Sequence, residues 1–514
     1  MKKQTNRSQS WPILLFTIGV FMAGLDNGII STALTTINDT FGVTPAWGAW
    51  SITIYTLGVA VSVPIIGKLS DNYGRKRLFI IEVFLFGLGS LLVALSPNFT
   101  FLLISRLIQA IGGGGIFIIA TSHVLATLPK DRQGKVLGLL GSMHGLSALF
   151  GPNIGAVILH MTGTWQWMFL INLPIAAFLI VFGMSKITET KSEYVKPLDM
   201  VGTVLLTTGV LSVKLGMTRV DMTQFMASIS RPDIAGLFVV GILVLILFVN
   251  FERIVEKKGG DPILAYSLLT GRAFQLTLCL GLLSGGFLAG IIFIPSYVQQ
   301  VLQVPVENAG FWLTPLALAS GIGAGLGGFL TDKYGATKTV MFSGSIGLIG
   351  FFMFPLIVSH FWTYLLACLL AGIGLGILLG APLNVLVGAS AGKNAQGSAL
   401  GALSLVRQIG LTLFPLLFAS FLTAGYKRVE PVVNNLYGED VVVFNPEQDG
   451  DATFGSLVEQ IERIPDLELQ TNILDTVSAV LKMGFDHMFI TSAILSFIVI
   501  VIGTYLSKME RSTD

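Results

Sequence analysis

The sequence predicts an all-α integral membrane protein with fourteen transmembrane helices. Hydrophobic residues make up 53% of the 514 residues and charged residues only 12%, and the mean hydropathy is +0.78. A soluble globular chain carries about a quarter charged residues. A membrane-spanning helix needs roughly 20 apolar residues, and division of the chain at its polar breaks gives fourteen such runs. Helices are expected because hydrocarbon offers no hydrogen bonds to backbone groups.

The predicted spans, in chain order, are 11–34, 46–67, 78–96, 100–124, 136–160, 166–186, 199–217, 233–252, 274–296, 308–331, 338–358, 361–386, 397–425 and 484–506. The first span follows Lys2, Lys3 and Arg7, as in a signal peptide. Its apolar run is longer than a signal core and further spans follow it, so we expect it to be a retained helix.

The distribution of Lys and Arg predicts the orientation in the membrane. Twenty-two of the 31 basic residues lie in segments on the N-terminal side of the membrane, six on the other side and three within spans. Cytoplasmic segments carry the excess of basic residues. Both termini are therefore expected in the cytoplasm, in agreement with the even number of spans.

The sequence contains no pattern that indicates an enzyme, a cofactor or a metal site. Cys279 and Cys368 both fall within predicted spans, and the five histidines have no metal-ligand spacing. Glycine-rich stretches such as Gly112–Gly115 lie in apolar spans and lack a following Lys-Ser/Thr, so they predict helix packing rather than phosphate binding. We expect no nucleic-acid partner.

A charged stretch separates the second and third spans: Gly67-Lys-Leu-Ser-Asp-Asn-Tyr-Gly-Arg-Lys-Arg77. It resembles the cytoplasmic latch of the major facilitator superfamily, Gly-x-Leu-x-Asp-x-x-Gly-Arg-Lys/Arg-x, and meets every fixed position. The resemblance implies a latch formed by Gly67, Asp71, Gly74, Arg75 and Arg77. It also implies that Asp71 meets a helix N-terminus or an arginine of the facing span.

A weaker copy of this motif, Gly328-Phe-Leu-Thr-Asp-Lys-Tyr-Gly-Ala-Thr-Lys338, indicates an internal repeat. Each copy joins the second and third spans of a six-span block. The predicted organisation is the major facilitator fold. It comprises a six-helix bundle over 1–186, two extra helices and a linker over 187–273, and a second six-helix bundle over 274–514. Parallel repeats of this kind place the substrate site between the halves.

The one long polar segment, 426–483, faces outward in this topology. It holds eleven acidic residues and four basic ones, and we expect a solvated loop. The apolar residues from Leu467 to Leu481 have helical spacing, so this part can also form a helix on the membrane surface.

The fifth predicted span contains Gly145, Gly151, Pro152 and Gly155. Small residues let helices approach closely, and Pro152 removes a backbone hydrogen bond and permits a bend. The spacing Gly-x5-Gly-Pro-x-x-Gly resembles the antiporter motif that marks exporters in this superfamily, with Ala156 in place of its last glycine. Ordinary helix packing is the alternative explanation.

Asp26 and Arg106 are two of the charged residues that lie within apolar spans. Asp26 stands in the first span, within Leu25–Leu34, and Arg106 in the fourth. A buried cation costs roughly 2.5–3.5 kcal/mol on insertion scales. Burial favours a neutral carboxyl group and a nearby cation favours the carboxylate, so such an acid can load and unload a proton as water access changes. The alternatives are a structural Asp26 and an Arg106 that extends to the membrane surface.

These stretches resemble motifs of the fourteen-helix drug:proton antiporter family. Leu25, Asp26, Ala33 and Leu34 match its first-helix motif, while Gly28, Ser31 and Thr35 depart from it. Arg106-Leu-Ile-Gln-Ala-Ile-Gly112 is similar to a motif tied to proton transfer, and Trp165–Pro174 is similar to a further signature. The resemblance implies proton coupling through Asp26 and Arg106. His144, which shortly precedes the Gly-Pro motif and can face the cavity, is a further candidate, and a structural, packed histidine is the alternative.

The expected function is proton-coupled export of small amphipathic or cationic compounds by alternating access, of the multidrug type, in a bacterial plasma membrane and as a monomer. The expected substrate cavity contains Asp26, Tyr55, Gln109, Phe311, Trp312 and Arg407. An exporter of one metabolite, amino acid or lipid remains open, as does a receptor or scaffold that does not transport. The tenth to thirteenth predicted spans contain no acid, and Asp486 lies only at the edge of the last span, which weakens the case for a divalent cation.

Overall fold

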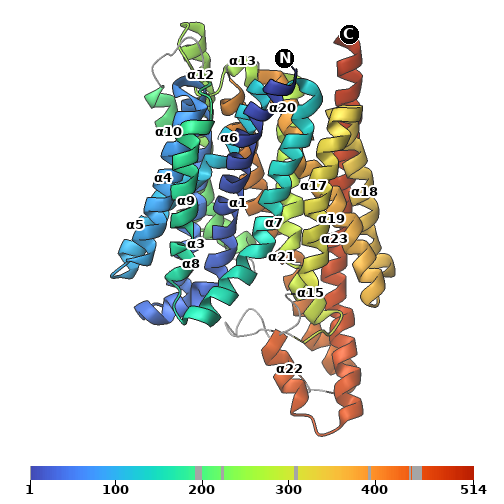
Figure 1. Ribbon diagram of the computed structural model, residues 1–514. Coiled ribbons are helices and arrows are strands. Elements are labelled where there is room, and N and C mark those ends of the chain that lie inside the picture. Colours follow the sequence, from blue (N-terminus) through green and yellow to red (C-terminus); the bar gives the residue numbers. More distant parts are fainter. Residues whose placement is uncertain are drawn as a thin grey trace.

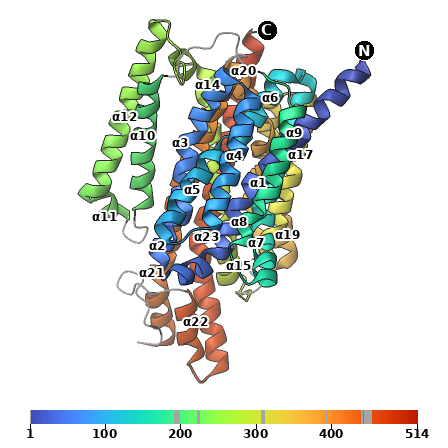
Figure 2. The same cartoon turned by 60° about the vertical axis from the view of Figure 1, so that its left-hand side comes forward.

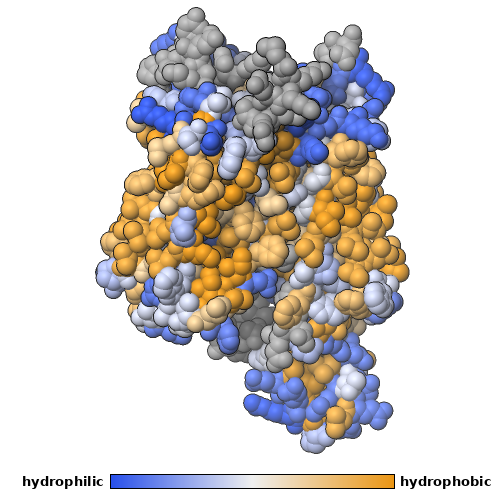
Figure 3. All heavy atoms as spheres, in the orientation of Figure 1, coloured by the Kyte–Doolittle hydropathy of each residue, from blue (hydrophilic) through white to orange (hydrophobic). Residues whose placement is uncertain are grey.

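The computed structural model describes residues 2–190, 199–220, 225–305, 311–391, 395–438, 442 and 454–513, and all of its regular structure is helical. Among these residues, thirteen helical segments are long and apolar enough to span a membrane, and the bent helix α7 makes a fourteenth. The prediction of an all-α membrane protein is confirmed. Figure 3 shows apolar side chains in a belt around the bundle and hydrophilic ones toward both ends.

The helices are α1 (Lys2–Phe41), α2 (Pro45–Gly48), α3 (Trp50–Tyr73), α4 (Arg75–Ala94), α5 (Phe99–Gly114), α6 (Ile116–Thr127), α7 (Lys130–Thr162), α8 (Trp167–Leu170), α9 (Asn172–Lys186), α10 (Met200–Thr218), α11 (Phe225–Ser230), α12 (Pro232–Lys257), α13 (Tyr266–Leu269), α14 (Arg272–Ile291), α15 (Ile294–Gln300), η1 (Phe311–Leu313), α17 (Thr314–Tyr334), α18 (Ala336–Ile357), α19 (Phe361–Gly380), α20 (Pro382–Ala391), α21 (Gln396–Tyr437), α22 (Phe454–Glu462) and α23 (Leu467–Thr513).

The helices α1–α9 pack with one another, and so do α14–α23. The closest neighbours include α1 with α7 in the first group, and α14 with α21 in the second. The two groups meet along α7 with α17 and along α3 with α21. Both chain termini lie at one end of the bundle, called the terminal end below, and α22 lies beyond the other end (Figure 1).

Helices α10 and α12 form a separate pair at the side of the bundle (Figure 2). They pack on each other, and α10 also contacts α3 and α21. Lys214 on α10 is buried, and its Nζ donates to the Thr56 carbonyl oxygen of α3 at 3.5 Å. This pair therefore lies outside the interface between the two groups of six spans.

The segment 426–483 differs from the expected loop. Helix α21 continues to Tyr437 and α23 begins at Leu467, so both extend beyond the predicted spans. Their apolar faces pack on α22 in a small separate core that contains Val429, Leu457 and Ile473. The apolar residues of 467–481 therefore pack against protein because neighbouring helices offer them partners, and a helix lying on the membrane surface is not observed.

Candidate functional site

A cavity of about 620 Å³ lies between the two groups of helices. Its volume falls in the usual range for small-molecule sites, roughly 300–1,000 Å³. The lining residues come from both groups: Thr32, Phe117, Gly141, His144, Gly145, Pro152, Asn153 and Ala156 on one side, and Leu288, Ile291, Phe311, Leu313, Thr314, Ala317, Ser320, Ala324, Leu379 and Arg407 on the other. A substrate bound here would contact both halves.

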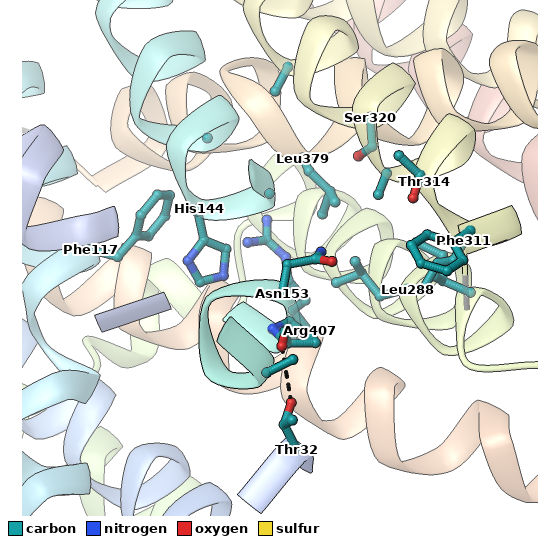
Figure 4. Close-up of a pocket in the computed structure, with 18 residues that line it drawn as sticks. Thr32, Phe117, His144, Asn153, Leu288, Phe311, Thr314, Ser320, Leu379 and Arg407 are labelled. Atoms are coloured by element: carbon teal, nitrogen blue, oxygen red, sulfur yellow. Dashed lines mark hydrogen bonds between the residues drawn. The ribbon is translucent and has the colours of Figure 1, made fainter. Parts of the chain in front are cut away.

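The basic side chains of the lining come from equivalent helices, His144 from α7 and Arg407 from α21. Figure 4 shows His144 and Asn153 beside Arg407, with Phe117 and Phe311 toward opposite sides. The Nε atom of Arg407 donates to Ser284 Oγ at 3.1 Å, and its Nη2 atom is buried without a hydrogen-bond partner among the described residues. Most of the remaining lining is apolar.

The latch residue Asp71 holds the two groups together at the terminal end. Asp71 Oδ2 accepts hydrogen bonds from the backbone amides of Gly397 (2.8 Å) and Ser398 (3.2 Å) in the first turn of α21. These amides have no acceptor within their own helix, and a helix N-terminus favours a negative charge. Asp71 therefore caps a helix of the other half, as the resemblance implied.

Other residues of the latch fix this contact. Arg75 Nη2 donates to Asp71 Oδ1 at 2.8 Å, and Arg75 Nε donates to Ser122 Oγ at 3.0 Å. Gly74 has φ 107°, which favours glycine and lets the chain turn sharply from α3 into α4. A Cβ atom on Gly67 would overlap the Gly397 carbonyl oxygen. Arg77 is exposed, and its backbone amide donates to Glu189 Oε2 at 3.1 Å.

The second copy of the motif makes the reciprocal contact. Asp332 Oδ1 and Oδ2 accept hydrogen bonds from the amides of Gly134 and Lys135 near the start of α7, each at 2.7 Å. A Cβ atom on Gly328 would overlap the Gly134 carbonyl oxygen. At the terminal end, an aspartate of each half thus accepts hydrogen bonds from the fifth span of the other half.

The cavity extends away from these contacts. Helix α7 starts at the terminal end, and its lining residues run from Gly141 to Ala156. Helix α17 starts at the opposite end, and its lining residues lie between Thr314 and Ala324. The structure therefore combines a closed terminal end with a cavity that spans the middle and opposite part of the bundle.

Asp26 and Arg106 form a buried ion pair inside the first group of helices. Arg106 Nη1 donates to Asp26 Oδ2 at 2.6 Å, and Gln109 Nε2 donates to Asp26 Oδ1 at 2.7 Å. The Arg106 guanidinium lies over the Tyr55 ring, 4.2 Å from its centroid. Neither Asp26 nor Arg106 is exposed, so Arg106 does not extend to the membrane surface, because its partner lies within the protein.

Helix α1 connects this ion pair with the cavity wall. A Cβ atom on Gly24 would collide with Ser147 and approach His144 Nδ1, and a Cβ atom on Gly28 would collide with Pro152. These glycines lie two residues before and after Asp26. Helix α7 bends by 42° between Ser147 and Phe150, next to the Gly-Pro motif. Gly151 packs on Gly28, and Gly155 lies near Thr32, so these two glycines of the motif lie at the contact of α7 with α1. Gly145 has open space beside it and lines the cavity.

The residues predicted to line the cavity lie in different parts of the structure. Phe311 and Arg407 line the cavity, as does His144. Asp26, Tyr55 and Gln109 belong to the buried ion-pair cluster and are not part of the lining. Asp26 and Gln109 are hydrogen-bonded to Arg106, and the Tyr55 ring packs against its guanidinium. Trp312 lies outside the lining, and its carbonyl oxygen accepts a hydrogen bond from Tyr364.

Several residues of the site were absent from the sequence-based prediction. Asn153 and Phe117 line the cavity, and Asn153 directly follows the Gly-Pro pair, a signal that was available. Asp261 follows α12 and pairs with the latch residue Lys68 at 2.6 Å. Its charge was visible, but nothing in a linker sequence indicates which helix the linker contacts.

This arrangement, two helical halves with a cavity between them and matching latches, defines a secondary transporter of the major facilitator type. The family model of the Major Facilitator Superfamily matches residues 16–415. The chain belongs to this superfamily.

Similar proteins agree with this assignment. The chain is 58% identical over 499 residues to an uncharacterized MFS-type transporter, YfiU, of Bacillus subtilis (strain 168), covering 96% of each chain. It is 31% identical to Multidrug resistance protein 3 of the same organism, covering 81% of this chain and 80% of the relative. The structure of the human organic anion transporter MFSD10 has a TM-score of 0.55 at 16% identity, covering 93% of this chain and 99% of that one, and shows a similar fold alone.

Proposed function

We propose that this protein is a proton-coupled exporter of small amphipathic compounds that works by alternating access in a bacterial plasma membrane, with both termini in the cytoplasm. The observation that carries the proposal is the cavity, which both halves line and which the two latches separate from the terminal end. With the termini inside, this is an outward-facing conformation. Release of the latches would open the cavity to the cytoplasm.

The Asp26–Arg106 pair is the proposed proton site. A proton on Asp26 would weaken the ion pair, which α1 connects with His144, Ser147 and Pro152 through Gly24 and Gly28. One proton crossing 100 mV provides about 2.3 kcal/mol, and each tenfold gradient costs about 1.4 kcal/mol. One proton can therefore sustain roughly a fiftyfold gradient of a neutral substrate.

The substrate range is part of the proposal. The relative named Multidrug resistance protein 3 supports drug export. Among the described residues, no carboxylate lines the cavity, so we retain amphipathic character rather than positive charge as the substrate property. Export of one metabolite, amino acid or lipid is the alternative, and a competition panel of such compounds would distinguish a broad from a narrow range.

The test uses purified protein in liposomes with a pH-sensitive dye inside and an imposed pH gradient. We expect amphipathic compounds to increase proton flux in the wild-type protein and not in Asp26→Asn. Asp39→Asn is the matched control, because Asp39 lies on the same helix but is exposed; it should retain the flux. Flux that survives in Asp26→Asn would move the proton site elsewhere, with His144 as the next candidate, and absence of flux with every compound would contradict the transport proposal.

A further inference from the structure

We propose, on the basis of the transport function above, that the cavity selects amphipathic organic anions and that Arg407 pairs with their anionic group. The relevant feature is an imbalance of charge. Arg407 is the one permanent cation of the described lining, and no described Asp or Glu lines the cavity with it. The salt bridges among the described residues include none to Arg407.

The two arginines within the spans differ in this respect. Arg106 has Asp26 at 2.6 Å and Gln109 Oε1 at 2.6 Å, and it is fully buried away from the cavity. Arg407 has only the neutral Ser284 hydroxyl at 3.1 Å, and its Nη2 atom lacks a partner among the described residues. A cation in a low-dielectric site without a counterion is costly. A bound carboxylate beside the guanidinium would supply the missing negative charge.

The internal repeat places a second basic side chain opposite Arg407. The backbone amides of Gly134 and Gly397 donate hydrogen bonds to the aspartates of the two latches. His144 lies ten residues after Gly134, and Arg407 lies ten residues after Gly397. The two side chains therefore occupy equivalent positions in the two halves, and both line the cavity. An anion between them would be held by both halves at once.

The remainder of the lining fits the apolar part of such a substrate. Phe117, Leu288, Ile291, Phe311, Leu313 and Leu379 supply apolar walls, and Asn153 supplies an amide beside Arg407 (Figure 4). A hydrogen bond between a guanidinium and a carboxylate is shorter and stronger than one between neutral groups, so it would position the anionic group of the ligand. The combination selects a flat or aliphatic group with one carboxylate.

The test measures binding rather than transport, so that its result is independent of the proposed function. The probes are dansylglycine, dansylamide and dansylcadaverine, which share one ring system and carry a negative, no and a positive charge. Calorimetry on the protein in nanodiscs, with empty nanodiscs subtracted, gives the dissociation constants. We expect dansylglycine to bind at least about tenfold more tightly than dansylcadaverine.

Variants assign the preference to Arg407. Arg407→Gln should weaken dansylglycine binding by about tenfold or more and leave dansylamide binding within about twofold. Arg407→Lys keeps the charge without the planar fork and should retain part of the preference. The matched control is Lys214→Gln, which removes another buried cation outside the cavity and should retain the whole preference.

Equal binding of the three probes, tighter binding of dansylcadaverine, or an anion preference that persists in Arg407→Gln would overturn the inference. Proton flux with dansylamide in the liposome assay, without any anion preference in binding, would leave the exporter proposal standing while this inference fails. Anion binding that depends on Arg407, without proton flux for any compound, would support this inference and contradict the exporter proposal.

Discussion

The two copies of the latch perform the same contact with different chemistry. Asp71 in the first half and Asp332 in the second each accept hydrogen bonds from two successive amides near the start of a helix in the other half. Asp71 is almost fully buried and paired with Arg75. Asp332 is partly exposed, and Ala336 stands where the first copy has Arg75.

The difference shows which part of the motif the geometry requires. The glycines and the carboxylate recur in both copies, because close backbone approach and helix capping depend on them. The arginine is needed only where the carboxylate is buried, since an unpaired buried charge is costly. The first latch should therefore contribute more to the closed terminal end than the second.

The largest effect is expected for Asp71→Asn. This substitution leaves Arg75 buried with Ser122 as its remaining side-chain partner, and loss of one member of a buried pair costs about 3–5 kcal/mol. We expect turnover to fall by more than about tenfold and the terminal end to open. Transport rates and the distance between spin labels at positions 186 and 508 would measure both, in a background without Cys279 and Cys368.

A double variant isolates the contribution of the Arg75 charge that Asp71→Asn leaves without a carboxylate partner. Asp71→Asn with Arg75→Gln leaves no unpaired cation, and the amide oxygen introduced by the first substitution can still accept from the start of α21. The double variant should recover part of the lost turnover and of the closed distance. Turnover equal to wild type in Asp71→Asn alone would contradict the assignment of Asp71 as the latch.

A smaller effect is expected for Asp332→Asn. The amide keeps one acceptor for Gly134 or Lys135 and loses the other, and no buried cation is left behind. A hydrogen bond to a charged group contributes about 1.5–3 kcal/mol. The same label pair should show a smaller opening than in Asp71→Asn. An equal or larger opening would mean that Arg75 adds nothing to the first latch.

The smallest effect is expected for the polar contact between the first latch and the linker after α12. Asp261 accepts from Lys68 Nζ at 2.6 Å and from Asn72 Nδ2 at 3.0 Å, and partly exposed ion pairs contribute about 1 kcal/mol or less. Asp261→Asn should lower turnover by about twofold to fivefold. Asp233→Asn, in the exposed pair with Arg231, is the control and should change turnover less. An unchanged Asp261→Asn would show that the two extra helices do not influence the latch.

The latch motif and the two charged residues Asp26 and Arg106 could be recognised in the sequence because their signals are local. A charged, glycine-bounded motif between two spans predicts a tight turn, and an arginine within a span requires a partner. The partner itself was a matter of tertiary structure. Asp26 lies 80 residues before Arg106, and only the packing of α1 against α5 decides that the two meet.

The cavity was harder to predict, because its lining depends on the rotation of each helix about its axis. Tyr55 and Gln109 look as suitable for a substrate as Phe311 does in the sequence, yet they face the ion pair. Arg407 was included among the cavity residues, but its lack of an acidic partner among the described residues could not be read from its neighbours in the chain.

The sequence by itself determined the membrane-spanning class, the two halves and the residues of the latch, because hydropathy and short motifs act over a few residues. The tertiary structure decided which helix starts the latches cap, which charged residues neutralise each other and which arginine lines the cavity. Those outcomes depend on contacts between segments far apart in the chain, where packing and the cost of burying an unpaired charge decide between partners.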